Sequence, residues 1–326
     1  MRNHPNPNPS NPVPSFSRFI GCDVGKASLV FFQTGAAATH AIANDRASIK
    51  AFAATLDPGC FLVCEATGGY EALLLSVWTS MGRAAHRADA RKVKAFIRSL
   101  GVLGKTDDID ARQLERYAKE RHAILPLWQP VDPNRQKLQA LVLTRQDMVA
   151  DRVAWTNRLK APGVDNARSH MAKILKCLQA QIAAIETEID ALIKNTASLR
   201  QSEEVLSAIP GIGARTAATL LALMPELGTM DRRQAAALAG LAPHPQKSGA
   251  TDAYRRTKGG RPLVKKALFL AAMSAAKNHP QLKLAHQRLR EAGKKPMVAL
   301  TAIMRKLIVI ANAKLRDSFK EGVKFV

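Results

Sequence analysis

Four acidic residues occur in an order that suits the binding of divalent metal ions. Asp23 lies inside an apolar, strand-like run, and Glu65 ends a second such run just before two glycines. Asp107 and Asp110 stand three residues apart at the start of a helical pattern, so their side chains share one face of that helix. An acid inside an apolar strand is costly unless it is paired or ligated. We therefore interpret these four residues as a metal-binding set, called the acid quartet below.

Carboxylates from separate elements suggest phosphodiester chemistry. Two divalent ions about 3.5–4 Å apart can stabilise both the attacking and the leaving oxygen of such a reaction. Mg²⁺ prefers oxygen ligands and keeps several waters, so three or four acids suffice. The alternative is that acids in a first helical turn only cap the helix. We apply that interpretation to Asp108, which is rotated about 100° from its neighbours and is favoured there by the helix dipole.

The charge of the chain points to a polyanionic partner. Its 326 residues include 49 Lys and Arg against 26 acids, a net charge of +23. Residues 246–326 alone carry 19 basic and 4 acidic residues. An excess of this size is typical of nucleic-acid-binding proteins, and the C-terminal quarter is expected to contact most of the phosphates.

Cysteine usage and hydropathy bear on the compartment. The four cysteines, Cys22, Cys60, Cys64 and Cys177, show no zinc-ligand spacing, and the first three fall in strand-like runs where buried thiols are common. This fits a reducing cytoplasm. No uninterrupted apolar run is long enough to cross a membrane, so no membrane partner is expected.

Composition shifts divide the chain into four segments. Residues 1–17 are a Pro- and Asn-rich tail expected to be disordered, and residues 18–125 alternate strand-like and helical patterns, which predicts an α/β domain. Within that domain, residues 83–98 form a basic stretch. We interpret it as a solvated helix face that could also bind the backbone of a nucleic-acid strand. Prolines then mark a linker that opens a helical segment over residues 126–200, and residues 201–326 form a basic, mainly α-helical domain.

Two patterns in the second half concern architecture and DNA contact. Apolar residues at alternating spacings of four and three predict a coiled-coil hairpin or a dimerising helix, although a single helix packed in a small bundle fits almost as well: Met171, Leu175, Leu178, Ile182, Ile185, Ile189 and Leu192. The sequence Ile209-Pro-Gly-Ile-Gly213 resembles a helix-hairpin-helix turn. There Gly211 and Gly213 would let backbone amides approach a DNA phosphate, the alternative being an ordinary tight turn.

Over nearly its full length the chain resembles the IS-one-ten family of insertion-sequence transposases, also called DEDD transposases, whose relatives include the pilin-gene DNA invertases. The acid quartet follows the order found in RNase H/RuvC nucleases. The order and spacing of four groups of residues carry the resemblance. They are the quartet with its glycines, 209–213 followed by 239–243 and Ser248-Gly249, the stretch 259–273, and the stretch 288–307. Thr251–Tyr254 and Lys265-Lys266 depart from the family pattern.

The resemblance implies a RuvC-like N-terminal domain with Asp23, Glu65, Asp107 and Asp110 as Mg²⁺ ligands. A helical coiled coil would join it to a C-terminal transposase domain with Ser248 as a nucleophile that the magnesium site assists. It also implies DNA at the element junction, donor and target, as substrate, a guide RNA as partner, and a place in the bacterial cytoplasm in association with the nucleoid. A homo-oligomer, a dimer or tetramer, is expected through the coiled coil. From the residues alone, Ser248 is a loop serine.

The basic residues near Ser248 would stabilise phosphate charge during an attack by its hydroxyl. We accordingly expect nucleic-acid contacts from Lys247, Arg255, Arg256, Lys258 and Arg261. Three other functions stay open. One is a RuvC-like nuclease that hydrolyses DNA with the acids alone, another is a site-specific DNA invertase, and the third is a binding protein without catalysis.

Overall fold

The computed structural model describes residues 15–101, 106–248 and 251–323. They belong to two compact units, residues 1–130 and 131–326, called the N-terminal and C-terminal units below. Most of the tail expected at residues 1–17 lies outside the described residues.

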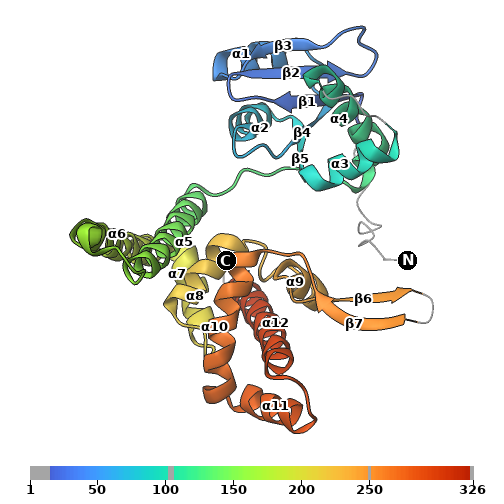
Figure 1. Ribbon diagram of the computed structural model, residues 1–326. Coiled ribbons are helices and arrows are strands. Elements are labelled where there is room, and N and C mark those ends of the chain that lie inside the picture. The colour runs from blue at the N-terminus through green and yellow to red at the C-terminus, as the bar shows by residue number, and fades with distance from the viewer. Residues whose placement is uncertain (1–14, 102–105, 249–250, 324–326) are drawn as a thin grey trace. The chain divides into compact units, whose positions relative to one another are not determined.

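A mixed five-stranded sheet forms the centre of the N-terminal unit (Figure 1). Its spatial order is β3-β2-β1-β4-β5, with β1, β2 and β3 antiparallel and with β4 and β5 parallel to β1. The bounds are β1 Arg18–Val24, β2 Ser28–Gln33, β3 His40–Ala43, β4 Cys60–Glu65 and β5 Ala84–Ala88. This order is compatible with an RNase H-like domain, and the expected α/β class of this part of the chain is confirmed.

Helices cover both faces of the sheet, and strand alternation decides which residues meet them. α1 (Arg46–Ala54) and α2 (Glu71–Ser80) pack on the face that includes Ile20 and Cys22, which share one core with Trp78 of α2. α3 (Ala90–Ser99) and α4 (Asp107–Arg121) pack on the other face, against Phe61 and Val63. A short 3₁₀ helix, His122–Ile124, follows α4. The first three cysteines are buried in or beside this sheet, as expected.

The interpretation of residues 83–98 as a solvated helix face was wrong for their first half. Residues 84–88 form the edge strand β5, and Arg83 and His86 are buried. The Arg83 guanidinium donates to the carbonyl oxygens of Leu56 and Asp57 at 2.9 and 2.8 Å. Local composition could not reveal this strand, because its partner carbonyls and its neighbour β4 come from distant parts of the chain.

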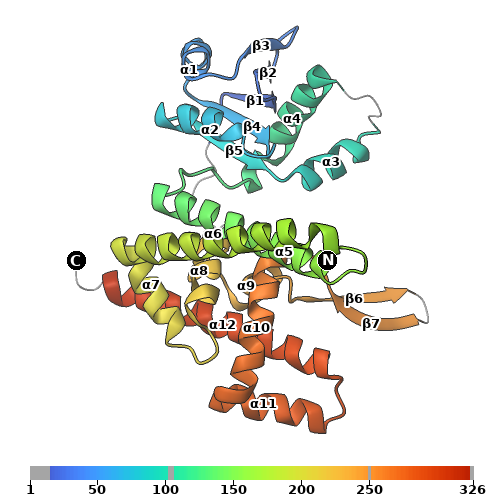
Figure 2. The ribbon, with the colours of Figure 1, turned by 60° about the vertical axis from the view of Figure 1, so that its left-hand side comes forward.

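The C-terminal unit is built from eight helices and one hairpin in its described part. Figure 2 shows α5 and α6 side by side. The helices are α5 Pro133–Leu159, α6 Arg168–Asn195, α7 Ala197–Ser207, α8 Ala214–Leu223, α9 Arg232–Leu238, α10 Pro262–Asn278, α11 Pro280–Glu291 and α12 Pro296–Val323, with a 3₁₀ turn at Asp165–Ala167. Leu138 of α5 and Ile189 of α6 belong to the same core as Leu220 of α8 and Leu307 of α12. The helices expected between a linker and the basic domain therefore share that domain's core.

The predicted heptad seam lies on one face of α6. Ile182 and Ile189 are buried, whereas Met171, Leu175 and Leu178 are half-buried. The end of α6 next to the core is thus closed by neighbouring helices, and the seam is less covered toward the other end. Coiled-coil pairing and dimerisation stay predictions.

Residues 243–248 were expected to form a loop and instead form a strand. β6 (Pro243–Ser248) pairs with β7 (Thr251–Thr257) in an antiparallel hairpin whose register is irregular between His244 and Gln246. Prolines are tolerated here because each strand of an isolated pair has a free edge. The turn residues of this stretch, above all its two prolines, concealed the strand in the sequence.

The last helix, α12, is long and apolar enough to span a membrane by length and composition. Its apolar residues face the core, where Ile303, Leu307 and Ala311 are fully buried. The buried Asn312 amide accepts from the Gly228 N–H and donates to the Met230 carbonyl at 2.8 and 2.7 Å. These contacts identify α12 as a core helix of the C-terminal unit.

Candidate active site

Strand pairing places the first two acids of the quartet next to each other. β1 and β4 are parallel neighbours with Cys22 opposite Cys64, so the following residues, Asp23 and Glu65, are also neighbours. The two cysteines point toward the α1/α2 face. Because successive side chains alternate, both carboxylates lie on the face covered by α3 and α4.

A glycine allows the helix that carries the other two acids to reach the sheet. A Cβ atom on Gly21 of β1 would lie 2.0 Å from the Ala111 carbonyl oxygen and 2.3 Å from the Glu115 nitrogen of α4. The α4 backbone therefore touches the strand two residues before Asp23. The Thr106 hydroxyl caps the helix by accepting from the Ile109 N–H at 3.2 Å, which begins the helix at Asp107.

All four acids of the quartet line one cavity of about 360 Å³. Thr67, Lys94 and Arg98 line it as well. Burial is the main cause that raises the pKa of Asp23, and the negative charges of Asp107, Asp110 and Glu65 raise it further. The prediction from spacing that these residues assemble at one place agrees with this geometry.

The donor set of this cavity suits a hard divalent cation, although the carboxylates lie farther apart than the ligands of a bound ion. Four carboxylates supply the oxygen ligands that Mg²⁺ prefers, and their mutual repulsion would be relieved by a cation. Among the described residues, however, no three His, Cys, Asp or Glu side chains converge closely enough to hold a metal ion. The fit is therefore one of charge and chemistry, with the final ligand positions left to adjust.

Asp108 takes the structural place expected for it. Its carboxylate accepts from the Thr39 hydroxyl at 2.7 Å on the exposed side of α4. On the same side, the Arg112 guanidinium donates to the Ala37 carbonyl at 3.3 Å and lies 4.2 Å from the centre of the Phe32 ring. These contacts tie α4 to the β2–β3 end of the sheet.

A buried glutamate that the sequence analysis missed shapes the turn beside Glu65. Glu71 is 2% exposed and accepts from the backbone N–H groups of Thr67 and Gly69 at 3.1 and 2.9 Å. It also accepts from the Arg87 guanidinium at 2.6 Å. The position Glu65-Ala-Thr-Gly-Gly-Tyr-Glu71 offered the only sequence signal, a carboxylate soon after a glycine turn.

The basic stretch of α3 faces two different cavities. Lys94 and Arg98, one helical turn apart, line the quartet cavity, whereas Lys92 lines a second cavity of about 690 Å³ together with Arg87 and Arg121. Neither Lys94 nor Arg98 forms an ion pair within the described part of the chain. Both side chains are exposed and remain available to a phosphate.

The C-terminal candidates lie on or near the hairpin. Ser248 is the last residue of β6 and pairs with Thr251, and Gly249 lies outside the described residues. The structure gives the strand positions of Lys247, Ser248 and Arg255 but not their side chains. A catalytic or binding role for these three residues stays a prediction.

The remaining basic candidates differ in what their side chains contact. Arg256 and Lys258 are exposed. Arg261 instead holds both carboxylate oxygens of Glu226 at 2.7 Å and donates to the Leu223 carbonyl at 2.5 Å. Its guanidinium is engaged inside the unit, so nucleic-acid contact by Arg261, still a prediction, would require this pair to open.

The glycines of the predicted helix-hairpin-helix turn have different surroundings. The turn does join two helices, α7 and α8. Gly211 has φ +103°, and a Cβ there would lie 2.7 Å from the Ala275 Cβ of α10. Gly213 caps α8, and a Cβ there would meet nothing within 4 Å. Gly211 is thus needed for packing, and the amides after Gly213 are the part of this turn open to a phosphate.

Two family models of transposases match parts of the chain. A family model described as "Transposase IS116/IS110/IS902 family" matches residues 203–287. A second, for the DEDD transposase domain of IS110 type and described as "Transposase", matches residues 20–162. The second match contains all four acids of the quartet, and the first contains Ser248.

Curated relatives fall into two groups. The "Pilin gene-inverting protein" of Moraxella lacunata is 29% identical over 261 residues, which cover 79% of this chain and 80% of the relative. That of Moraxella bovis is similar to the same extent. An "Insertion element IS110 uncharacterized 43.6 kDa protein" of Streptomyces coelicolor is 33% identical over 150 residues, covering 45% of this chain and 36% of the relative.

Proposed function

We propose that this chain breaks and rejoins DNA with the acid quartet and Ser248. The chain belongs to the IS116/IS110/IS902 family of transposases and is a DNA recombinase. The observation that carries the first half is the single cavity lined by Asp23, Glu65, Asp107 and Asp110. The proposal for Ser248 rests on its place beside a run of basic residues and on the family resemblance.

Each group has a defined task in this proposal. When bound, Mg²⁺ would stabilise negative charge on the phosphate and on the leaving oxygen. Asp23, Glu65, Asp107 and Asp110 hold the cation, and Lys94 and Arg98 hold the DNA backbone beside them. The Ser248 oxygen bonds to phosphorus while the bond from phosphorus to a deoxyribose oxygen breaks, and the proton that the Ser248 hydroxyl loses ends, through solvent, on that leaving oxygen. Attack by a deoxyribose oxygen reverses the step, so strands rejoin without ATP.

A guide RNA and a homo-oligomer complete the proposal. The C-terminal unit carries the main positive excess, which would serve an RNA as well as a DNA backbone. The half-covered part of the α6 seam offers apolar residues to a second copy of the chain. Omission of RNA from the reaction tests the first point, and the mass of the purified protein in solution tests the second.

A covalent adduct distinguishes this proposal from hydrolysis. Purified protein is incubated with Mg²⁺, labelled DNA spanning the element junction and RNA from its noncoding end, then run on a denaturing protein gel. We expect a labelled band at protein mass that is absent in Ser248→Ala and present in Ser198→Ala, a change of an exposed serine on α7. Free cleaved DNA from all three proteins would instead establish a RuvC-like hydrolytic nuclease.

The pilin gene-inverting relatives favour one second candidate, a site-specific DNA invertase. Such an enzyme would use the same residues. A plasmid with two inverted copies of the junction separates the two functions, since an invertase flips the segment between the copies and a transposase moves the element to new DNA.

A further inference from the structure

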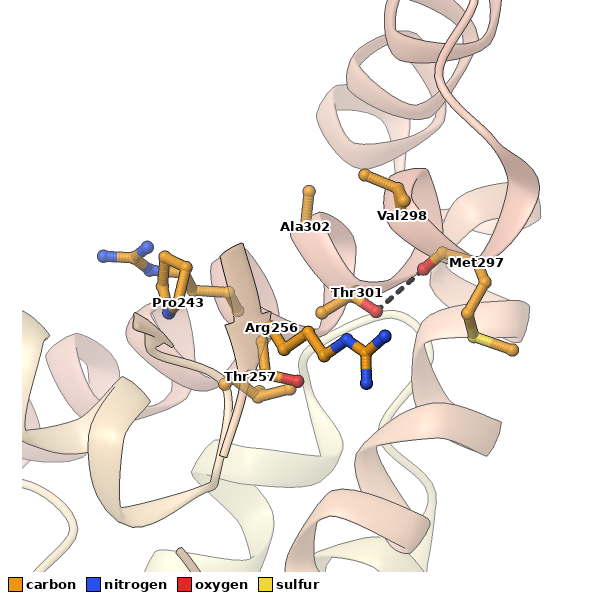
Figure 3. Close-up of a pocket in the computed structure, with 9 residues that line it drawn as sticks. Pro243, Arg256, Thr257, Met297, Val298, Thr301 and Ala302 are labelled. Carbon is orange, nitrogen blue, oxygen red and sulfur yellow. Dashed lines mark hydrogen bonds between the residues drawn. The ribbon is translucent and has the colours of Figure 1, made fainter. Parts of the chain in front are cut away.

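A cavity of about 470 Å³ lies between β7 and α12 in the C-terminal unit. Apolar groups form much of its wall, and Arg256, Thr257, Thr301 and Arg305 supply the polar part. Figure 3 shows the Arg256 side chain reaching from β7 toward Thr301 and Met297 of α12. None of the residues lining the cavity is acidic, so its charge is positive.

The walls of this cavity are held in place from behind. Leu241 is buried, and α12 is anchored in the core by Ile303 and Leu307. On β7, the Thr257 hydroxyl accepts from the Lys265 ammonium at 2.9 Å. The Thr301 hydroxyl donates to the Met297 carbonyl at 2.7 Å, which leaves its oxygen free to accept from a ligand amine. The cavity is therefore a built feature of this unit.

The two arginines are available to an anion. Within the described part of the chain, neither Arg256 nor Arg305 forms an ion pair, in contrast to Arg261, which holds Glu226. Met297, at the mouth of the cavity, is 58% exposed despite its apolar side chain. A largely apolar cavity with unpaired guanidinium groups at its wall suits a weakly polar group attached to phosphate, which is the chemistry of a nucleotide.

The position of the cavity near Ser248 favours a nucleotide of the bound DNA as its occupant. Arg256 pairs with His244, four residues along β6 from Ser248. Four strand residues span about 13 Å, which is about four base-pair steps of 3.4 Å. A DNA strand whose phosphate lies at Ser248 can thus place a nearby nucleotide at the cavity.

We propose that this cavity holds one nucleobase unstacked from the bound DNA, with the adjacent phosphates on Arg256 and Arg305. This inference rests on the proposed recombinase function and adds a specific subsite to it. An extruded base would locally open the duplex near the phosphate to be broken. Its binding site would also give the protein a direct contact with one position of its target.

The test uses the full chain and a junction duplex in which 2-aminopurine replaces one base at a time. This base fluoresces weakly when stacked and strongly when unstacked. We expect protein binding to raise the fluorescence severalfold at one position, about four base-pair steps or fewer from the broken phosphate. Ala302→Leu, which fills the cavity, should abolish that rise, and its thermal unfolding is measured to show that the chain still folds.

Two variants on α12 test the charge. Arg305→Ala should weaken DNA binding about fivefold or more, whereas Lys306→Ala, the adjacent exposed residue outside the cavity, should change it about twofold or less. Flat fluorescence at every position with DNA still bound would overturn the inference, as would a rise that survives Ala302→Leu. A rise seen only with RNA or a free mononucleotide would overturn DNA as the occupant. A wild-type chain that does not bind the junction DNA at all would refute the proposed function itself. A fluorescence rise without a covalent adduct at Ser248 would refute the serine mechanism alone.

Discussion

At the scale of single residues, the candidate site depends on Gly21, because glycine has no Cβ atom. The absent Cβ lets the α4 backbone contact β1, and this contact brings Asp107 and Asp110 to the cavity that Asp23 and Glu65 line. The glycine thus contributes to the candidate site only through the position of α4. The sequence contained the residue, but only the packing of α4 shows why a side chain is excluded there.

We predict that Gly21→Ala pushes α4 away from the sheet. The added methyl would overlap backbone atoms that cannot move aside, so the free energy of unfolding should fall by about 1–3 kcal/mol. Displacement of two carboxylates by about 1 Å should slow strand breakage about 100-fold. Urea unfolding and cleavage of the junction DNA measure the two effects. Wild-type values for both would show that α4 does not depend on this contact.

At the scale of elements, the turn between β4 and α2 depends on Glu71. Burial by itself would raise the pKa of Glu71, but the hydrogen bonds from Arg87 and from backbone N–H groups outweigh it and hold the pKa below its ordinary 4.5. The unfolded chain therefore binds a proton more readily than the folded chain does. The stabilisation by Glu71 is complete above pH 4.5 and is lost as the pH falls through the lower folded value.

We predict that Glu71→Gln reduces the free energy of unfolding by about 1–3 kcal/mol at pH 7, because Arg87 and two backbone amides lose a charged acceptor. The difference between variant and wild type should shrink below pH 4.5. Chemical denaturation at several pH values measures it. A difference that stays constant down to the acid limit would mean that the carboxylate charge contributes nothing.

The two-sided helix α3 gives a second prediction at this scale. Lys94 lines the quartet cavity and Lys92 lines the other one. Lys94→Ala should lower the rate of strand breakage at saturating DNA about tenfold or more, since the phosphate loses a positioning contact. Lys94→Arg should restore most of the rate, and Lys92→Ala should change it about twofold or less. Equal losses from Lys92→Ala and Lys94→Ala would show that α3 contributes general charge only.

Sequence patterns could identify those elements whose signal is local. The apolar runs around Asp23 and Glu65, and the acids that begin α4, predicted the strands, the helix and the shared cavity. β5 was missed because burial by distant segments, and not local composition, makes a strand of Ala84–Ala88. β6 was missed because prolines and turn residues hid the pairing of Pro243–Ser248 with β7. The pairing of Arg261 with Glu226 was invisible for the same reason, since 35 residues separate the partners.

At the scale of the whole molecule, charge is divided unequally between the two units. Residues 131–326 carry 33 Lys and Arg against 15 acids, whereas residues 1–130 carry 16 against 11. The N-terminal unit thus holds the acid quartet, and the C-terminal unit holds most of the positive charge that would attract a nucleic acid.

We predict that this attraction depends strongly on salt and that the hairpin contributes to it. Replacing Arg255 and Arg256 by alanine should reduce the slope of log affinity against log salt by about 1.8, or 0.9 for each lost phosphate contact. Arg261→Ala should reduce the slope less than the double variant does and should lower the melting temperature, because its guanidinium is paired with Glu226 inside the C-terminal unit. Filter binding over a range of salt concentrations, with thermal unfolding beside it, separates the two effects. An unchanged slope in the double variant would place that pair outside the interface.

The burial of α12 in the C-terminal core has a consequence for the order in which the two units fold during synthesis. The N-terminal unit consists of the first 130 residues and can fold while the rest of the chain is being made. The C-terminal core includes Leu315 of α12, so it closes only after that residue has been made. At about 5–20 residues per second, that interval is about 10–40 s. A nascent chain that ends before α12 thus has the carboxylates without the completed basic unit, and we expect it to bind DNA firmly only once α12 has been made.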